Sequence, residues 1–198
     1  NECIGSLSLG VKIGETYTDY SQGSVRQTGG TYDLALSGSG FFTVSVTDKA
    51  GEVHTRYTRD GRFHLTKDGL LVDADGNAVQ GQNGNITIDP SSKNVSISAT
   101  GQITADGELV DTLNIVDFED YDYLKKYGDT MYEPVDGATT KDAEGEILQG
   151  YTEQSNVNVV REMVDMITIT RAYEASQKVI HSYDSMLDKS VNQVGALK

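Results

Sequence analysis

The sequence predicts a mainly β protein, in which an antiparallel β domain follows an extended N-terminal segment and precedes a long C-terminal α-helix. Two observations carry this prediction. Asp-Gly and Asn-Gly pairs recur between short alternating or β-branched runs in residues 29–150, as in antiparallel hairpins. Beyond residue 153 those turn signals stop, and apolar side chains recur at alternating steps of four and three.

The first 28 residues form the first of three expected parts. Val11, Tyr17 and Tyr20 lie there among few turn residues, which predicts an extended connecting segment over residues 1–28. Cys3 is the only cysteine, so no intrachain disulfide can form. The stability of this chain is therefore expected to come from packing and assembly.

The second expected part is an antiparallel β body over residues 29–152. Each Asp-Gly or Asn-Gly pair is expected to form a two-residue hairpin turn. These pairs begin at Asp60, Asp68, Asp75, Asn83, Asp106 and Asp136. The strand-like runs between them are 41–46, 53–58, 62–66, 70–72, 86–88, 95–98, 102–104 and 113–118. Residues 120–127 are the only part of this region that suits a short helix.

The third expected part is an assembly helix over residues 153–198. Its apolar positions define a seam, the strip that would face a partner helix in a coiled coil. The seam consists of Val159, Met163, Met166, Tyr173, Ile180, Leu187, Val191 and Val194. Thr170, Gln177 and Asp184 interrupt it, while Val179 and Met186 widen the apolar face. The segment is longer than an ordinary globular helix, which favours a coiled coil or a helix shared between chains.

The ends of this helix carry recognisable signals. Ser155, Asn156 and Asn158 are all good N-cap residues, and the sequence does not choose among them. Gly195 suits the C-terminal end. Periodicity leaves open whether the stripe packs on the chain's own β body or on other chains.

The same helical segment carries a family resemblance. Residues 155–159, Glu-Met-Val-Asp-Met at 162–166 and Arg-Ala-Tyr-Glu-Ala at 171–175 resemble the C-terminal signature of the bacterial flagellar rod and hook proteins. Further matching elements lie at 23–24, 33–36, 38–42 and 57–63, in the order and approximate spacing of the proximal-rod and distal-rod subunits. The motif residues in the helical segment are Ser155, Asn156, Asn158, Arg171, Ala172, Tyr173 and Glu174.

This resemblance implies a structural subunit of the flagellar basal-body rod, located outside the cytoplasmic membrane. It implies helical self-assembly, contacts with neighbouring rod and hook proteins, and export by the flagellar type III apparatus. Family members begin with a helix that contains an Ala-Ser-Gly-Met and an Asn-Asn-Leu-Ala-Asn element, and neither element occurs here. We therefore expect a chain that lacks its N-terminal helix. The alternative is a β-domain binding module, for example for carbohydrate, with a helical oligomerisation tail.

The sequence makes no positive case for catalysis, metal or cofactor. Asp73 and Asp75 resemble the start of a calcium loop, but Ala78 and Gly84 stand where that loop needs Gly and Glu, so a hairpin tip is expected. The glycines at 38 and 40 lack the third glycine and the helix of a dinucleotide site. His54, His64 and His181 have no zinc-site spacing. The acids Asp117, Glu119, Asp120 and Asp122 are expected to form a solvated face rather than a catalytic pair.

Charge and hydropathy limit the partners. The chain carries 30 acidic and 16 basic residues, and its net charge of −14 argues against nucleic acid. Most of that acidic excess lies before residue 153. No run of apolar residues reaches the length of a membrane span, and no small-molecule substrate is indicated.

Overall fold

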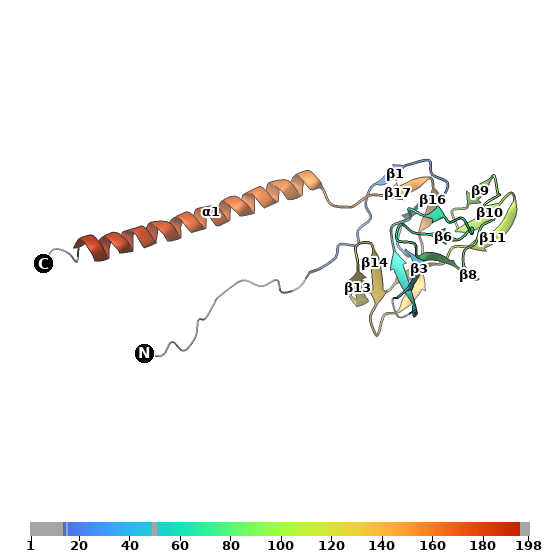
Figure 1. The fold of residues 1–198 in the computed structure, drawn as a ribbon, viewed down its shortest axis with the longest axis horizontal. Helices are drawn as coiled ribbons and strands as arrows, with labels where there is room; N and C mark the ends of the chain where they lie inside the picture. The colour runs from blue at the N-terminus through green and yellow to red at the C-terminus, as the bar shows by residue number, and fades with distance from the viewer. Residues whose placement is uncertain (1–13, 15, 49–50, 195–198) are drawn as a thin grey trace. The chain divides into compact units, whose positions relative to one another are not determined.

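The computed structural model describes residue 14 and the ranges 16–48 and 51–194, the last two residues by their backbone alone. The chain divides into two compact units, and the division falls between Ser155 and Asn156. The first unit contains the β strands, and the second contains one long helix (Figure 1). The predicted mainly β fold with a long C-terminal helix is confirmed. The three-part division at residues 28 and 152 stays a prediction, and residues 1–13 and 15 lie outside the described part.

The elements follow the turn signals and the helical periodicity of the sequence. The strands are β1 (Val25–Gln27), β2 (Leu34–Ser37), β3 (Phe41–Thr47), β4 (Val53–Thr58), β5 (His64–Leu65), β6 (Leu71–Val72), β7 (Ala78–Gly81), β8 (Gly84–Asn85), β9 (Val95–Ile97), β10 (Gln102–Ala105), β11 (Glu108–Thr112), β12 (Ile115–Phe118), β13 (Leu124–Tyr127), β14 (Met131–Pro134), β15 (Thr140–Asp142), β16 (Glu146–Gln149) and β17 (Tyr151–Glu153). The helices are the 3₁₀ turn η1 (Tyr121–Tyr123), α1 (Val159–Lys189) and the π turn η2 (Ser190–Val194).

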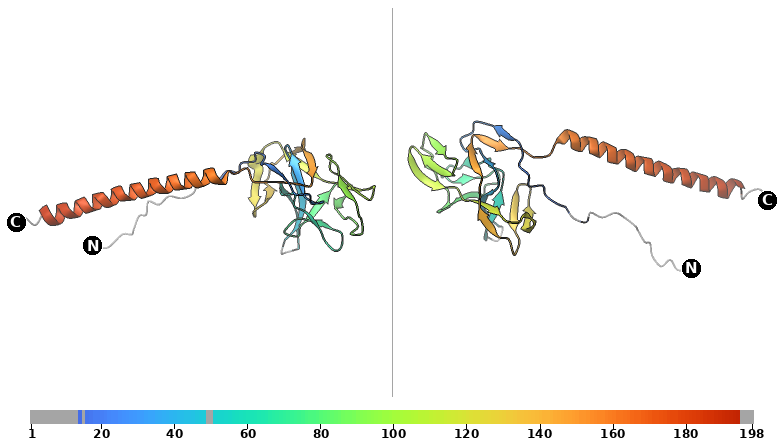
Figure 2. Two further views of the ribbon diagram at one scale, coloured as in Figure 1. Left: turned by 90° about the horizontal axis from the view of Figure 1, so that it is seen from above. Right: turned by 180° about the vertical axis from the view of Figure 1, so that it is seen from behind.

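All the pairings between these strands are antiparallel, and β3 lies at their centre. β3 pairs with β4 along one edge and with β7 and β12 along the other, within a sheet that runs β13-β14-β4-β3-β7-β6-β5. β9, β10 and β11 form a separate three-stranded sheet. That sheet and the β13·β14 hairpin lie at opposite ends of the body in the views of Figures 1 and 2.

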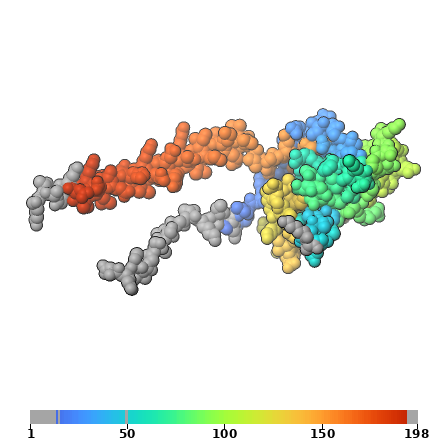
Figure 3. All heavy atoms as spheres, viewed as in Figure 1, coloured from blue at the N-terminus to red at the C-terminus, as the bar shows by residue number. Residues whose placement is uncertain are grey.

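The core of the body follows from the alternation of side chains along β3. Successive residues of a strand point to opposite faces. Phe42 and Val44 therefore join the main apolar core, whereas Phe41 packs in a second cluster with Phe118 and Leu124. Residues 41–46 of β3 are all buried, as expected of a central strand covered on both faces. Figure 3 shows the body as a closely packed mass of atoms.

The short helix that residues 120–127 suit is present, but it is limited to the 3₁₀ turn η1, because Leu124 to Tyr127 pair with β14 instead of continuing it. The predicted hairpin turn at Asp60-Gly61 is wrong; residue 61 instead lies against the Leu34 carbonyl, where a side chain would collide. The hairpin predicted at Asp136-Gly137 is also wrong, because β14 pairs with β13 and β4 while β15 pairs with β12. In contrast, Asp106-Gly107 forms the predicted hairpin turn between β10 and β11, with both residues at positive φ (52° and 92°).

Candidate assembly surfaces

The helix α1 begins where a side chain satisfies its first free N–H groups. Asn158 is the N-cap, and its Oδ1 accepts hydrogen bonds from the backbone N–H groups of Val160 (3.1 Å) and Arg161 (3.2 Å). The negative side chain of Glu162 lies in the first turn, where the helix dipole favours it. Asn158 is thus the residue that caps the helix, while Ser155 and Asn156 precede it.

The predicted seam runs along α1 and carries exposed apolar side chains. Val159, Met163, Met166, Tyr173, Ile180, Leu187 and Val191 each expose between 57% and 69% of their surface. The side chain of Val194 lies outside the described part. None of the described side chains of α1 is buried. Arg171, Ala172 and Glu174 of the family motif are also exposed. The role of the seam in assembly stays a prediction.

Polar side chains that interrupt the seam find hydrogen-bond partners inside the helix. The Thr170 hydroxyl donates to the Met166 carbonyl at 2.8 Å, and the Gln177 side-chain amide donates to the Tyr173 hydroxyl at 3.0 Å. A polar group that already has a partner costs less to bury than an unpaired one. These two interruptions are therefore compatible with a packed seam.

A two-stranded stem precedes the helix in the chain. β1 and β17, which we call the stem, pair Val25 with Glu153 and Gln27 with Tyr151. The Gly150 carbonyl closes one end by accepting hydrogen bonds from the N–H groups of Thr28 and Gly29 (2.8 and 3.0 Å). The chain thus enters and leaves the body through two neighbouring strands, although they are more than a hundred residues apart in the sequence.

One arginine ties the stem to the body. Arg59 donates from Nε to Glu153 Oε2 at 3.1 Å, and its two terminal nitrogens donate to the carbonyls of Gly40 (2.8 Å) and Gly38 (3.0 Å). The other carboxylate oxygen of Glu153 accepts from the Gly23 N–H at 2.9 Å. Both charged side chains are mostly buried, at 20% and 12% exposed. This clamp joins β17 to two loops of the body at once.

Aromatic packing fixes the segment before the stem. The ring of Tyr20 lies 4.9 Å from that of Tyr121 and 5.3 Å from that of Tyr132, and edge-on to Phe41 at 6.3 Å. Ring pairs at these separations are favourable beyond the area that they bury. Sequence reasoning placed Tyr20 in an extended segment but found neither this contact nor the clamp. The only sequence signal for the packing of Tyr20 was the presence of a large aromatic side chain in a segment with few other apolar residues.

Asp117 differs from the acidic residues that follow it. The prediction of a solvated face is wrong for this residue, whose side chain is fully buried and lies 3.1 Å from Lys141 Nζ. Its Oδ1 accepts from the Tyr121 hydroxyl at 2.7 Å and from the Phe118 N–H at 2.9 Å. Burial by itself raises the pKa of Asp117, but these hydrogen bonds, with others from Ser39 and Lys141, outweigh burial and lower that pKa below 3.8. Burial and the bond to Asp117 raise the pKa of Tyr121 to about 12.

The remaining acidic residues and the histidines do not converge. Glu119, Asp120 and Asp122 are exposed, and Asp120 caps η1 by accepting the Asp122 N–H at 2.9 Å. His54 and His64 lie on β4 and β5, with three strands between them in the sheet. Within the described ranges, no group of three or more His, Cys, Asp or Glu side chains is arranged to hold a metal ion.

The calcium-like segment is the hairpin tip that the sequence predicts. Asp73 Oδ1 accepts from the N–H groups of Asp75 (3.0 Å) and Asn77 (2.8 Å), and its Oδ2 accepts from the Asn77 side chain at 3.0 Å. The carboxylate thus stabilises the turn between β6 and β7.

Among the helices of the described residues, none is long and apolar enough to cross a membrane.

A β body that is joined by a stem to a long helix with a regular exposed apolar seam is typical of a structural protein. Known proteins agree with this class. The profile of the flagellar basal body rod FlgEFG C-terminal domain matches residues 148–194, and that of the flagellar hook protein FlgE/F/G D1 domain matches residues 35–105.

Individual relatives match over most of their length. The flagellar basal-body rod protein FlgG of Buchnera aphidicola subsp. Schizaphis graminum is 36% identical over 196 residues, which cover 92% of this chain and 73% of the relative. FlgG of Bacillus subtilis is 32% identical over 205 residues (94% and 74%), and the rod protein FlgF of Caulobacter vibrioides is 34% identical over 181 residues (90% and 72%).

The chain belongs to the FlgF/FlgG-like family of flagellar basal-body rod proteins. It functions as a structural rod subunit. Of the two functions expected from the sequence, the rod subunit is therefore supported over the β-domain binding module.

Proposed function

We propose that the chain assembles helically with other subunits into a shaft by burying the seam of α1 against partner helices. The observation that carries this proposal is the exposure of six regularly spaced seam side chains on α1 and of Val191 in η2, which follows it. A helix gains most of its stability in proteins from the packing of an apolar face rather than from its own hydrogen bonds. Each apolar seam side chain that a partner covers contributes about 1.5 to 3 kcal/mol.

The proposed shaft is mechanical. Identical subunits whose contacts do not close into a ring build an open helical assembly. The helices would form its packed interior and the β bodies its outer layer, and the shaft would transmit torque to the hook and filament. The stem and the clamp at Arg59 support this proposal, because they connect the strand that leads to α1 with the body.

We further propose that the chain contacts neighbouring rod and hook proteins, is exported by the flagellar type III apparatus, and works outside the cytoplasmic membrane without catalysing a reaction. Membership of the rod protein family supports these proposals.

The test changes Ile180 and Leu187, which lie one heptad apart on the seam, to Asp in the full-length protein. Charges at both positions remove apolar burial at every subunit contact and add a desolvation penalty. Motility should be lost, whereas the melting temperature of the β body should not change, because both side chains are mostly exposed on α1.

The matched control places two Asp residues at His181 and Ser185, off the seam in the same turns. It should retain motility. Normal swimming of the Ile180→Asp, Leu187→Asp variant would refute the role of the seam. An unfolded body in that variant would show instead that the helix packs on its own chain.

A further inference from the structure

The apolar surface of α1 extends beyond the seam, and it does so on different sides in its two halves. Val160, Val164 and Ile167, which we call the upstream flank, lie about 100° to one side of the seam residues in their own turns. Val179, Tyr183 and Met186, which we call the downstream flank, lie about 100° to the other side of the seam in their turns. All six side chains are more than half exposed.

Charged residues take the place of each flank in the other half of the helix. Glu162 and Asp165 occupy the downstream side in the first turns, while Arg171 and Lys178 occupy the upstream side further along. A single partner that follows the seam would leave both flanks uncovered. The pattern therefore predicts two further contacts, one for each half of α1.

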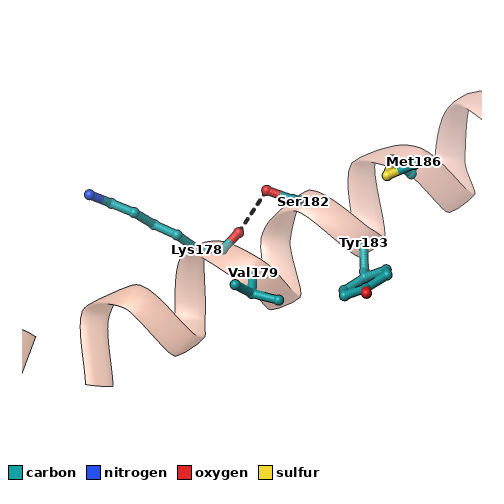
Figure 4. A pocket seen from close by; sticks show the side chains of 5 residues that line it. All are labelled: Lys178, Val179, Ser182, Tyr183 and Met186. Atoms are coloured by element: carbon teal, nitrogen blue, oxygen red, sulfur yellow. Dashed lines mark hydrogen bonds between the residues drawn. The ribbon is translucent and has the colours of Figure 1, made fainter. Parts of the chain in front are cut away.

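The downstream flank already has the form of a docking site for a side chain. Val179, Ser182, Tyr183 and Met186 line a hollow on α1 together with Lys178, and the residues of the seam do not line it. The first four stand at i, i+3, i+4 and i+7, the four positions that form a hole for a knob of a facing helix. Figure 4 shows Val179 and Tyr183 projecting from the same side of the helix.

The hollow needs no polar partner. The Ser182 hydroxyl donates to the Lys178 carbonyl at 2.8 Å, so it is satisfied within the helix (Figure 4). The remaining lining is Val179, Tyr183 and Met186, with Lys178 as the one charged residue. An apolar side chain of moderate size, such as isoleucine or valine, is the chemistry that fits.

We propose that this hollow receives Ile167 from the upstream flank of a second copy of the chain. The two helices would run parallel, with an axial offset of roughly 15 to 16 residues, or about 22 to 24 Å at 1.5 Å per residue. The inference rests on the proposed assembly into a shaft. It adds a lateral contact and its register, neither of which the seam specifies.

Three features of α1 favour a second copy at this offset. The two flanks lie on opposite sides of the helix and at different heights, the arrangement of a heterologous contact that repeats without closing. Without an offset, Val164 of one copy would meet Glu162 and Asp165 of the next, and those carboxylates would lose water without gaining a partner. An offset of about 15 residues places Glu174 level with Lys189 of the neighbour, so that opposite charges meet.

Cysteine cross-linking in assembled shafts tests the register. In the full-length protein, Cys3→Ser removes the cysteine of this chain, and Ile167→Cys with Tyr183→Cys places one thiol on each flank. The matched control combines Ile167→Cys with Ile169→Cys. These two thiols lie on opposite sides of the helix at nearly the same height, so they would meet only if neighbouring copies packed without an axial offset. A disulfide needs Cα atoms within about 7 Å of each other.

Mild oxidation of shafts isolated from cells should convert most of the Ile167→Cys, Tyr183→Cys chains into a ladder of multimers on a denaturing gel. The control should remain monomeric. A ladder from the control, or none from the first pair in shafts that do form, would overturn the offset. Dimers from the Ile167→Cys variant alone would show an antiparallel contact between copies instead.

Charge reversal gives a second test that needs no cysteine. Glu174→Lys should weaken each lateral contact by roughly two- to fivefold, seen as easier dissociation of isolated shafts by heat. Adding Lys189→Glu should restore the original midpoint. These residues are too far apart to touch within one helix, so rescue requires a contact between copies, and failure of rescue would contradict the offset. The Ile180→Asp, Leu187→Asp variant tests the seam by itself, and loss of its shafts supports the seam proposal. The cross-links and the charge rescue test the lateral contact, so failure of one proposal can be told from failure of the other.

Discussion

The two units of the molecule obtain their stability in different ways. In the body, Leu34 and Phe42 are fully buried, and Arg59 is held by groups up to 94 residues away. In α1 none of the described side chains is buried, and the side-chain hydrogen bonds within the helix span three or four residues. The body thus has its own core, whereas α1 has only local interactions. Changes in one unit can therefore be separated experimentally from changes in the other.

The largest expected effect comes from the core of the body. Phe42→Ala removes a fully buried ring that packs edge-on against Phe63 at 5.2 Å. It should lower the free energy of unfolding of the body by about 3 to 5 kcal/mol, measured by chemical denaturation. Val53→Ala, at a side chain that is 64% exposed, is the control and should change it by less than about 0.5 kcal/mol. Equal effects of the two changes would contradict the assigned core.

The clamp should give a smaller effect that is confined to the stem side of the body. Arg59→Ala leaves Glu153 with the Gly23 N–H but without its cation, so it should cost about 2 to 4 kcal/mol. Amide hydrogen exchange should accelerate in β1 and β17 more than in β3. The double variant with Glu153→Gln should cost less than the sum of the single changes. Additive costs would show that the two side chains act independently.

The cap of α1 should give a still smaller effect, this time outside the body. Asn158→Ala removes the acceptor for the Val160 and Arg161 N–H groups and should destabilise the helix by about 1 kcal/mol. Faster amide exchange in the first turn of α1, with no change in the melting of the body, is the expected result. Asn158→Ser keeps a capping oxygen and should behave like the original protein. A change in body stability would contradict the separation of the two units.

The smallest expected effect is a pH dependence of the body. The folded-state pKa of Asp117 is lowered, so its ionised form stabilises the fold above about pH 4, and this contribution is lost as the pH falls through the lowered pKa. Asp117→Asn should therefore flatten the decline of body stability below pH 4, measured by denaturant titration at several pH values. An unchanged slope would show that other carboxyl groups cause the decline.

The difference between the two units also explains what the sequence could predict. Local patterns sufficed for the long helix, for the antiparallel strands and for the turn at Asp106-Gly107, because each of these depends on neighbouring residues. The choice of Asn158 as the cap needed backbone geometry, since Ser155 and Asn156 have equal capping chemistry. Local signals were therefore sufficient for these features, although the same turn signal was wrong at Asp60-Gly61, where the neighbouring Leu34 carbonyl fixes the backbone instead.

The remaining features depend on residues that are distant in the chain. The clamp joins positions 94 residues apart, and Tyr20 contacts rings that lie about a hundred residues further on. Residues 124–127 form a strand only because β14 is available to pair with them. Asp117 is buried because Lys141 and Tyr121 reach it. A single sequence carries no signal for such pairings, so these are the places where prediction failed or found nothing.

The stem has a consequence for how such a protein can change over evolution. Because β1 and β17 are paired neighbours, everything between Gln27 and Tyr151 is an insertion whose two ends are already joined. The β1·β17 pairing, and not the number of residues in the body, therefore sets the distance between the points where the chain arrives and departs. Insertions or deletions in the body that keep the contacts of Arg59 and Tyr20 should leave that distance unchanged.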